Sequence, residues 1–413
     1  QWTPKLEERY KLLGITDPFE PQAFPVRLWD VFGQAGHPVR ATVEGMGSLL
    51  LSRLLDLNET QSGILAIVFK VAQEKDWPLI DLKDLQSLLK EVYEHSSDYS
   101  AQYGNITKQS VGAIQRSLLV LEEEGADQFF GEPALDLNDF MQLDASGRGY
   151  INILSATKLF HSPKLYSTFL IWMLSRLFET LPEVGDPEKP KLVFFFDEAH
   201  LLFKDASKLF LEKVEQVVRL IRSKGVGIYF ITQNPQDLPE SVLAQLGNRV
   251  QHALRAYTPK EMKAIKVAAQ SFRPNPDFDT ETVITELGTG EALVSFLNEK
   301  GQPSVVERAY ILSPQSSFDL LNESEQLALI TTSPFHQKYA TTIDRESAYE
   351  KLAAKASKEA QEEEQKEAEK EEAAADKAAQ KRSPGRPRKS SLEKAKDSFL
   401  SSLFRTIARE IAK

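Results

Sequence analysis

Cysteine is absent from the 413 residues. Without thiols the chain has no disulfide framework, no thiolate metal site and no cysteine nucleophile. This composition fits a reducing, cytoplasmic setting. The six histidines are scattered without an HExxH or other paired spacing, so the sequence predicts no metal site built from protein ligands alone.

A long apolar run is also lacking. The densest run, 169–174, lies inside a helix-like stretch, 164–181, and is followed by Arg176. It is too short to span a bilayer, so we expect a buried helix and no transmembrane segment. The first residues, QWTPKLEERY, lack the apolar core of a signal peptide and begin with Gln. We therefore expect the natural N-terminus to lie upstream.

The net charge of -10 is unevenly distributed. Charged residues sum to about -13 over 1–349, -4 over 350–380 and +7 over 381–413. Because the body of the chain is acidic, any contact with nucleic acid there must be local. The net positive charge lies in the tail.

The order of sequence patterns predicts an α/β fold with a helical insertion and a charged C-terminal tail. Strand patterns alternate with helices from about residue 149, as a mostly parallel sheet with crossover helices requires, and the last two strands should form an antiparallel hairpin. The expected strands are 26–32, 149–154, 191–196, 227–232, 250–256, 291–296 and 305–312. The expected segments are a connecting segment of the core (1–40), a helical insertion (41–130), the main core (131–345), a charged linker (346–390) and an amphipathic helix (391–413).

Helix starts are marked in the insertion by residues that cap well. Thr60 is expected to cap a helix that runs to Glu74, and Asp81 or Asp84 a second that ends near His95. A further helix should follow Thr107 and run to about residue 124.

The strongest chemical signal is KLVFFFDEAHLLF, in which an apolar strand delivers Asp197 and Glu198 to its C-terminal end. A strand buried on both faces is continuously apolar, and ligands of an open parallel sheet bind beyond the carboxyl ends of its strands. This is a Walker B arrangement: Asp197 is placed to hold Mg²⁺, directly or through water, and Glu198 to polarise an attacking water. The alternative is a buried strand that ends in two surface acids.

About 35 residues later a second apolar strand, GVGIYFITQNP, ends in Thr232 and Gln233, and Thr232 is expected, with Asp197, to bind the cofactor. An amide at this place can hydrogen-bond the γ-phosphate or the attacking water, whereas the alternative is an ordinary strand before an Asn-Pro turn. The pairing of Gln233 with the two acids favours the sensor interpretation.

Phosphoryl-transfer motors need a cation that a neighbouring subunit supplies, and several residues of this chain are candidates for that cation. Arg219, Arg222 and Lys224 follow a helix pattern, and Arg249 and Arg255 come after the second strand. For each of them, a surface charge or a salt bridge is the competing interpretation.

The phosphate cradle is missing, because no G-x-x-x-x-G-K followed by Ser or Thr occurs in the 413 residues. The glycine segments GTGEA and GMGSLL contain no lysine. We therefore expect this chain alone to bind nucleotide weakly or not at all.

Four blocks carry a family resemblance: KPKLVFFFDEAHLLF, the long block from VVRLIRSKGVGIYFITQNP to RAYTP, FPVRLWDVFGQAGHPVRATVEGMG, and GEALVSFL. From about residue 8 to about 353 the chain resembles the bacterial HerA-like ATPases of the YjgR type, which are related to HerA/FtsK motors. The resemblance implies a RecA-like P-loop NTPase core, ATP and Mg²⁺ as cofactors, and a Walker A loop upstream of residue 1. By the same resemblance Asp197 and Glu198 match Walker B, Gln233 matches the sensor, and Arg255 and Arg222 match arginine-bearing blocks.

The resemblance also implies partners: a homo-oligomer in the form of a hexameric ring, DNA, and a nuclease or another protein. A motor that moves protein is a second interpretation, and a nucleotide-free scaffold is a third. The string DEAH also invites comparison with DEAH-box RNA helicases, but nothing in the chain supplies their second RecA domain, and His200 is expected to start a helix. In the tail, PGRPRK resembles an imperfect AT-hook, with a basic linker as the alternative.

Overall fold

The computed structural model describes residues 4–16, 20–185, 187–203, 208–317 and 319–380. The chain divides into two compact units, Gln1–Leu352 and Ala353–Lys413. The basic stretch 382–390 and the expected amphipathic helix 391–413 lie outside the described residues.

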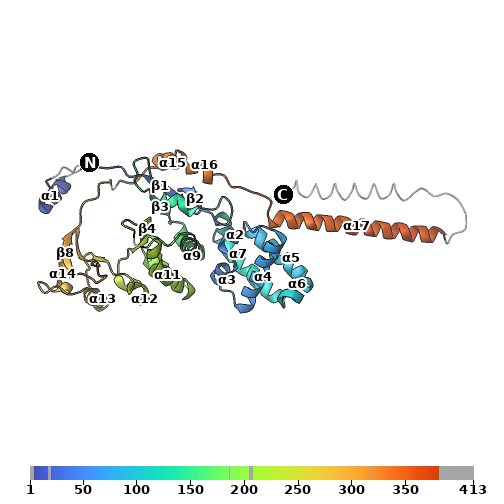
Figure 1. Cartoon of the computed structure of the whole chain (residues 1–413), viewed down its shortest axis with the longest axis horizontal. Helices are drawn as coiled ribbons and strands as arrows, with labels where there is room; N and C mark the ends of the chain where they lie inside the picture. The colour runs from blue at the N-terminus through green and yellow to red at the C-terminus, as the bar shows by residue number, and fades with distance from the viewer. Residues whose placement is uncertain (1–3, 17–19, 186, 204–207, 318, 381–413) are drawn as a thin grey trace. The chain divides into compact units, whose positions relative to one another are not determined.

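A three-stranded parallel sheet joins segments that are far apart in the sequence (Figure 1). β1 (Val26–Asp30) lies between β2 (His37–Pro38) and β3 (Ile151–Ser155), and Val26 pairs with Ile151. α15 (Glu323–Thr331) contacts β1, and α16 (Phe335–Tyr339) contacts β2. Helices from near the end of the first unit therefore contact this sheet.

A helical segment separates β2 from β3. Its helices are α2 (Val43–Met46), α3 (Ser48–Leu54), α4 (Glu59–Lys75), α5 (Leu82–Glu94), α6 (Ser96–Tyr103), α7 (Lys108–Glu123) and α8 (Ala126–Phe129). Asp81 caps α5 and Thr107 caps α7, as predicted. The expected cap Thr60 is wrong, because Asn58 caps α4 and forms a reciprocal capping box with Gln61.

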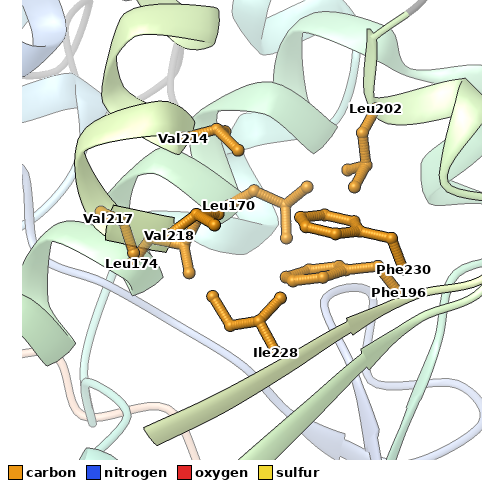
Figure 2. A pocket seen from close by; sticks show the side chains of 9 residues that line it. All are labelled: Leu170, Leu174, Phe196, Leu202, Val214, Val217, Val218, Ile228 and Phe230. Atoms are coloured by element: carbon orange, nitrogen blue, oxygen red, sulfur yellow. The ribbon is translucent and has the colours of Figure 1, made fainter. Parts of the chain in front are cut away.

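A two-stranded parallel sheet carries the candidate chemistry. β4 (Leu192–Phe196) pairs in register with β5 (Val226–Phe230), and α9 (Pro163–Thr180) packs beside α11 (Lys208–Leu220). Apolar side chains from both helices, from both strands and from Leu202 line a cavity of only about 10 Å³. Figure 2 shows these side chains, among them the stacked rings of Phe196 and Phe230. Because this space is no larger than one water molecule requires and its lining is apolar, it is a packing gap within the core.

The other face of β4 is not buried, in contrast to the prediction. Phe195 is 64% exposed and Tyr229 is 55% exposed, and their rings stack with centroids 4.6 Å apart. Of the described elements, α9 and α11 cover the face that carries Phe194 and Phe196. The apolar run of β4 therefore combines a core face with an exposed aromatic face.

The last three strands in the sequence form an antiparallel sheet that has its own hydrophobic core. β7 (Glu291–Ser295) lies between β6 (Arg249–Gln251) and β8 (Glu307–Tyr310), which confirms the predicted terminal hairpin. α13 (Pro259–Gln270) and α14 (Thr280–Glu286) pack together, and their apolar residues form a separate cluster with Leu293 and Val306. The α/β class is confirmed, but the strands among the described residues form three sheets, and the expected strand 250–256 is only three residues long.

The remaining helices are α1 (Pro4–Leu13), α10 (His200–Phe203), α12 (Glu240–Leu243) and α17 (Ala348–Gln380). Within the expected charged linker 346–390, the structure shows that Ala348–Gln380 is a helix. Within the described ranges, no helix is both long enough and apolar enough to span a bilayer.

Candidate functional site

The parallel pairing of β4 and β5 brings the two predicted motifs together. Phe196 pairs with Phe230, so the residues that follow each strand leave the sheet at the same edge. Beyond the strands the chains stay joined, since the Ile231 amide donates to the Phe196 carbonyl (2.9 Å) and the Ala199 amide donates to the Ile231 carbonyl (2.8 Å). These bonds hold Asp197, Glu198 and Gln233 at one edge although 35 residues separate the last two.

Glu198 and Gln233 are in direct contact. The Gln233 side-chain amide donates to both carboxylate oxygens of Glu198, at 3.1 and 3.3 Å. Glu198 has a backbone φ of +47°, in the left-handed region that residues other than glycine rarely adopt. The turn after β4 therefore holds this carboxylate against the amide in an unusual backbone conformation.

His200 joins this pair, which the sequence analysis did not foresee. It is the first residue of α10, as predicted, and its Nδ1 lies 3.2 Å from Oε2 of Glu198. The geometry is not that of a hydrogen bond, since this enclosed nitrogen has no hydrogen-bond partner. The signal for it was local: a histidine two residues after the second acid, on the turn that starts the helix.

Asp197 has the properties that a magnesium ligand needs. Its side chain is exposed, and Oδ1 accepts the Glu198 amide at 2.9 Å. Carboxylate oxygens suit Mg²⁺, which commonly takes one or two carboxylates and completes its shell with water and phosphate oxygens. Among the described residues no group of three or more potential ligands converges, so an ion here would depend on water and nucleotide.

Thr232 lies beside the contact but makes a different bond. Its hydroxyl donates to Oδ2 of Asp237 at 3.0 Å, across a 3₁₀ turn, η4 (Pro235–Asp237), that is capped by the Asn234 side chain. This bond closes the loop after β5. Thr232 therefore fixes the segment that carries Gln233.

The candidate cations are distributed over two regions. Arg255 donates to the carbonyls of Thr285 and Leu287, which lie at the end of α14. Lys224 is buried and donates to the Leu181 carbonyl at 2.7 Å. Arg222 follows α11 in a 3₁₀ turn, Ile221–Lys224. Neither Arg255 nor Lys224 contacts Glu198 in the part of the chain that the structure describes.

The other two candidate cations also lie in these regions. Arg219 stands in the last turn of α11. Arg249, in β6, donates to the Ser271 carbonyl at 2.8 Å. Because Ser271 is the C-cap residue of α13, this hydrogen bond stabilises the end of that helix, and Arg249 has a structural role.

The two glycine segments without lysine, GTGEA and GMGSLL, have structural roles. In GTGE, the Gly288 amide donates to the Glu291 carboxylate, and Arg9 donates to the carbonyls of Thr289 and Gly290. In GMGS, Gly47 is the junction between α2 and α3, with φ +78°. Neither segment has the form of a phosphate cradle.

The chain is similar to known proteins. The family model described as "Helicase HerA-like C-terminal" matches residues 1–413. The chain is 25% identical over 211 residues to the DNA double-strand break repair helicase HerA of Saccharolobus solfataricus, a match that covers 50% of this chain and 40% of that protein. It is 30% identical over 120 residues to the probable helicase MJECL08 of Methanocaldococcus jannaschii, covering 28% and 21%. The matches thus span well under half of each relative.

A solved structure with a similar fold is the bacterial conjugative coupling protein TrwB. The sequence identity is 11%, and the match covers 76% of this chain and 83% of that chain with a TM-score of 0.46. The match to the family model stands on sequence.

Proposed function

Because the chain belongs to the Helicase HerA-like C-terminal family, we propose that it provides the hydrolytic edge of an ATP-driven motor of the HerA/FtsK type that acts on DNA. Its fold class is the predicted RecA-like P-loop NTPase class. The observation that carries the proposal is the Glu198–Gln233 contact beside Asp197, at the carboxyl ends of two paired parallel strands.

The proposed roles follow from these contacts. Bound ATP and Mg²⁺ supply the γ-phosphate and neutralise part of its charge. Asp197 is proposed to bind the ion through its exposed carboxylate. Glu198 is proposed to accept the proton of the attacking water, and the Gln233 amide holds that carboxylate in place. The amide oxygen of Gln233 then stays available to accept a hydrogen bond from the same water.

The supporting residues are part of the same proposal. Thr232 is proposed to position the sensor loop through Asp237. Arg222 and Arg255 are proposed as the cations that reach a neighbouring subunit's site, although Arg255 would first have to release the two carbonyls of α14. These roles require an assembly, and we propose a homo-oligomeric, hexameric ring in a reducing cytoplasm, with a nuclease or another protein as a further partner.

The domain division predicted from the sequence is kept as part of this proposal. Residues 131–345 and the connecting segment 1–40 form the motor core, and 41–130 is an insertion. The charged linker 346–390 leads to the expected helix 391–413. Because the 413 residues contain no Walker A sequence, the proposal requires that residues outside them hold the phosphates.

The test is Mg²⁺-dependent ATP hydrolysis, measured with and without DNA on this chain and on the protein expressed from its complete coding sequence. We expect hydrolysis by the complete protein, acceleration by DNA, and loss of about two to four orders of magnitude in Glu198→Gln. Glu299→Gln, at an exposed hairpin position, is the matched control and should keep full activity. Hydrolysis that DNA leaves unchanged would favour a protein cargo. An inert complete protein would favour the scaffold.

A further inference from the structure

An exposed basic stripe runs along α13. Lys260, Lys263 and Lys266 recur every three residues and all are exposed, while Ala264, Ile265 and Ala268 face the core. Residues three apart on a helix are neighbours, with Cβ atoms about 5–6 Å apart. The three ammonium groups therefore share one face of the helix.

These lysines are not neutralised by neighbouring acids. In the described parts of the chain, none of the three has an ion pair or a side-chain hydrogen bond. The acid on the same helix, Glu261, is turned toward the helix start, where it accepts the amides of Tyr257 and Thr258 at 2.7 and 2.8 Å. These hydrogen bonds lower the pKa of Glu261, and the bond from the Tyr257 amide has the largest effect. The capping box thus leaves the stripe with three uncompensated charges.

An aromatic ring lies at the start of the stripe. Tyr257 is 88% exposed, while its backbone amide is fixed by Glu261. A large ring held in solvent next to unpaired lysines is the combination that single-stranded nucleic acid uses, because bases stack on aromatic side chains and phosphates attract lysine. A core role for this ring is excluded by its exposure.

The helix that carries the stripe also contacts the loop of the proposed sensor. α13 contacts η4, and that turn begins two residues after Gln233. The loop that positions the amide beside Glu198 therefore packs against the same helix as the lysines. The body of the chain is acidic overall, so this local patch is not part of a general basic surface.

We propose that Lys260, Lys263 and Lys266, together with Tyr257, form a binding surface for single-stranded nucleic acid, in which the lysines bind the phosphates and the ring stacks on a base. The proposal rests on the proposed function, since it assigns to the motor the surface that contacts its substrate. It adds the place, the strandedness and the chemistry of the contact.

The first experiment measures binding of fluorescent oligothymidine to this chain by anisotropy, without nucleotide, over a range of salt concentrations. The variant K260Q/K263Q/K266Q is compared with K75Q/K83Q/K108Q, which removes the same charge from three exposed lysines on α4, α5 and α7. We expect the α13 variant to bind more weakly and its salt slope to fall by about 2, since each lost phosphate contact contributes about 0.7 for a single strand. The scattered control should keep the original slope.

Each other result overturns the proposal. If the two triple variants weaken binding equally, net charge and not the stripe is responsible. If the α13 variant binds like the original chain, the contact lies elsewhere, including the basic tail 381–413, which both variants retain. A chain that does not bind oligothymidine at all also refutes it.

The ring is tested by Tyr257→Ala against Tyr257→Phe. Loss of one stacked base should weaken oligothymidine binding about five-fold to a hundred-fold in the alanine variant, whereas phenylalanine should retain binding because the ring is kept. Duplex binding should change little in both. Equal losses for single strand and duplex would refute stacking.

Failure of this inference is distinguishable from failure of the proposed function. Binding is measured without ATP, so it does not depend on Asp197 or Glu198. In the complete protein, the α13 variant should retain basal hydrolysis and lose stimulation by DNA. Absent basal hydrolysis in the original protein would reject the motor while the binding result stands.

Discussion

Glu198 combines a proposed catalytic carboxylate with an unusual backbone conformation. The sequence predicts its place after an apolar strand, but not its backbone, which has φ +47°. Left-handed conformations disfavour side chains, and such strain concentrates at functional sites. The hydrogen bonds from Gln233 and the joined strand ends hold the residue in this conformation.

Comparison of Glu198→Gly with Glu198→Ala tests this strain. Both remove the carboxylate, but only glycine adopts positive φ without steric conflict. We expect the glycine variant to have a free energy of unfolding about 0.5–1 kcal/mol higher than the alanine variant. Urea denaturation measures it. An alanine variant that is equally or more stable would show that the turn relaxes when the side chain is removed.

His37 is a second residue whose environment the sequence does not reveal. It is completely buried in β2, packs against Trp29 and Phe335, and neither ring nitrogen has a hydrogen-bond partner. Burial, and then the charges of His336 and Arg27, lower its pKa to about 4. The folded chain therefore keeps this imidazole neutral in mildly acidic solution.

The sign of the resulting pH dependence is fixed. The unfolded chain binds a proton at His37 below about pH 6.5, whereas the folded chain does so only near pH 4. Stability from this residue is complete above pH 6.5 and is lost as the pH falls toward 4, by about 3 kcal/mol. His37→Phe should flatten this part of the profile in urea titrations. An unchanged profile in that variant, or a flat one in His336→Gln, would assign the effect to another group.

At the scale of elements, the starts of helices were the feature that the sequence predicted best. Asp81 and Thr107 cap where predicted, because capping depends on the few residues next to the helix start. The error at Thr60 was avoidable: Gln61 stands three residues after Asn58 and completes a capping box, whereas Gly63 stands three residues after Thr60 and has no side chain to do so. The exposed face of β4 was not readable in this way, since composition does not show which elements cover a strand.

Asp84 connects two elements that are distant in sequence. Its buried carboxylate accepts the amides of Ile80 and Asp81 through Oδ2, and the Ser347 hydroxyl and Tyr349 amide through Oδ1. It thereby joins the start of α5 to the start of α17. One acidic side chain satisfies four donors from two parts of the chain.

Asp84→Asn should lower the free energy of unfolding by about 2–4 kcal/mol, since an amide nitrogen cannot accept hydrogen bonds and leaves buried donors unpaired. Amides at 347–352 should exchange faster with deuterium. Asp81→Asn is the control, because asparagine caps helices as well as aspartate and the change should be nearly neutral. Equal effects of the two substitutions would mean that the buried carboxylate is not the connecting group.

At the scale of the whole molecule, long-range pairing limited the prediction. The α/β class, the final hairpin and the meeting of Asp197, Glu198 and Gln233 followed from strand order and from where strands end. The division into three sheets did not, because β1 pairs with β3 across more than a hundred residues and local patterns do not encode that pairing. His200 was missed for a related reason, since its approach to Glu198 depends on the turn and not on the strand.

The division of the first unit into two cores leads to a prediction about cooperativity. One cluster joins the helical segment, β1 and the β4–β5 layer, and includes Leu88. The other is confined to α13, α14 and the antiparallel sheet, and includes Ile284. Because regions with separate cores open as separate units, loss of packing in one core should not loosen the other.

Ile284→Ala and Leu88→Ala test this independence, since both side chains are fully buried and each truncation should cost about 2–5 kcal/mol locally. Deuterium exchange should quicken over 254–309 in Ile284→Ala, while α4, α5 and α7 keep their protection. In Leu88→Ala the pattern should be reversed. If either substitution accelerates exchange in both regions, the cores unfold together. In that case a change on the basic stripe would reach Glu198 through loosening of the whole fold. The local contact between α13 and the loop that carries Gln233 would not be the only route.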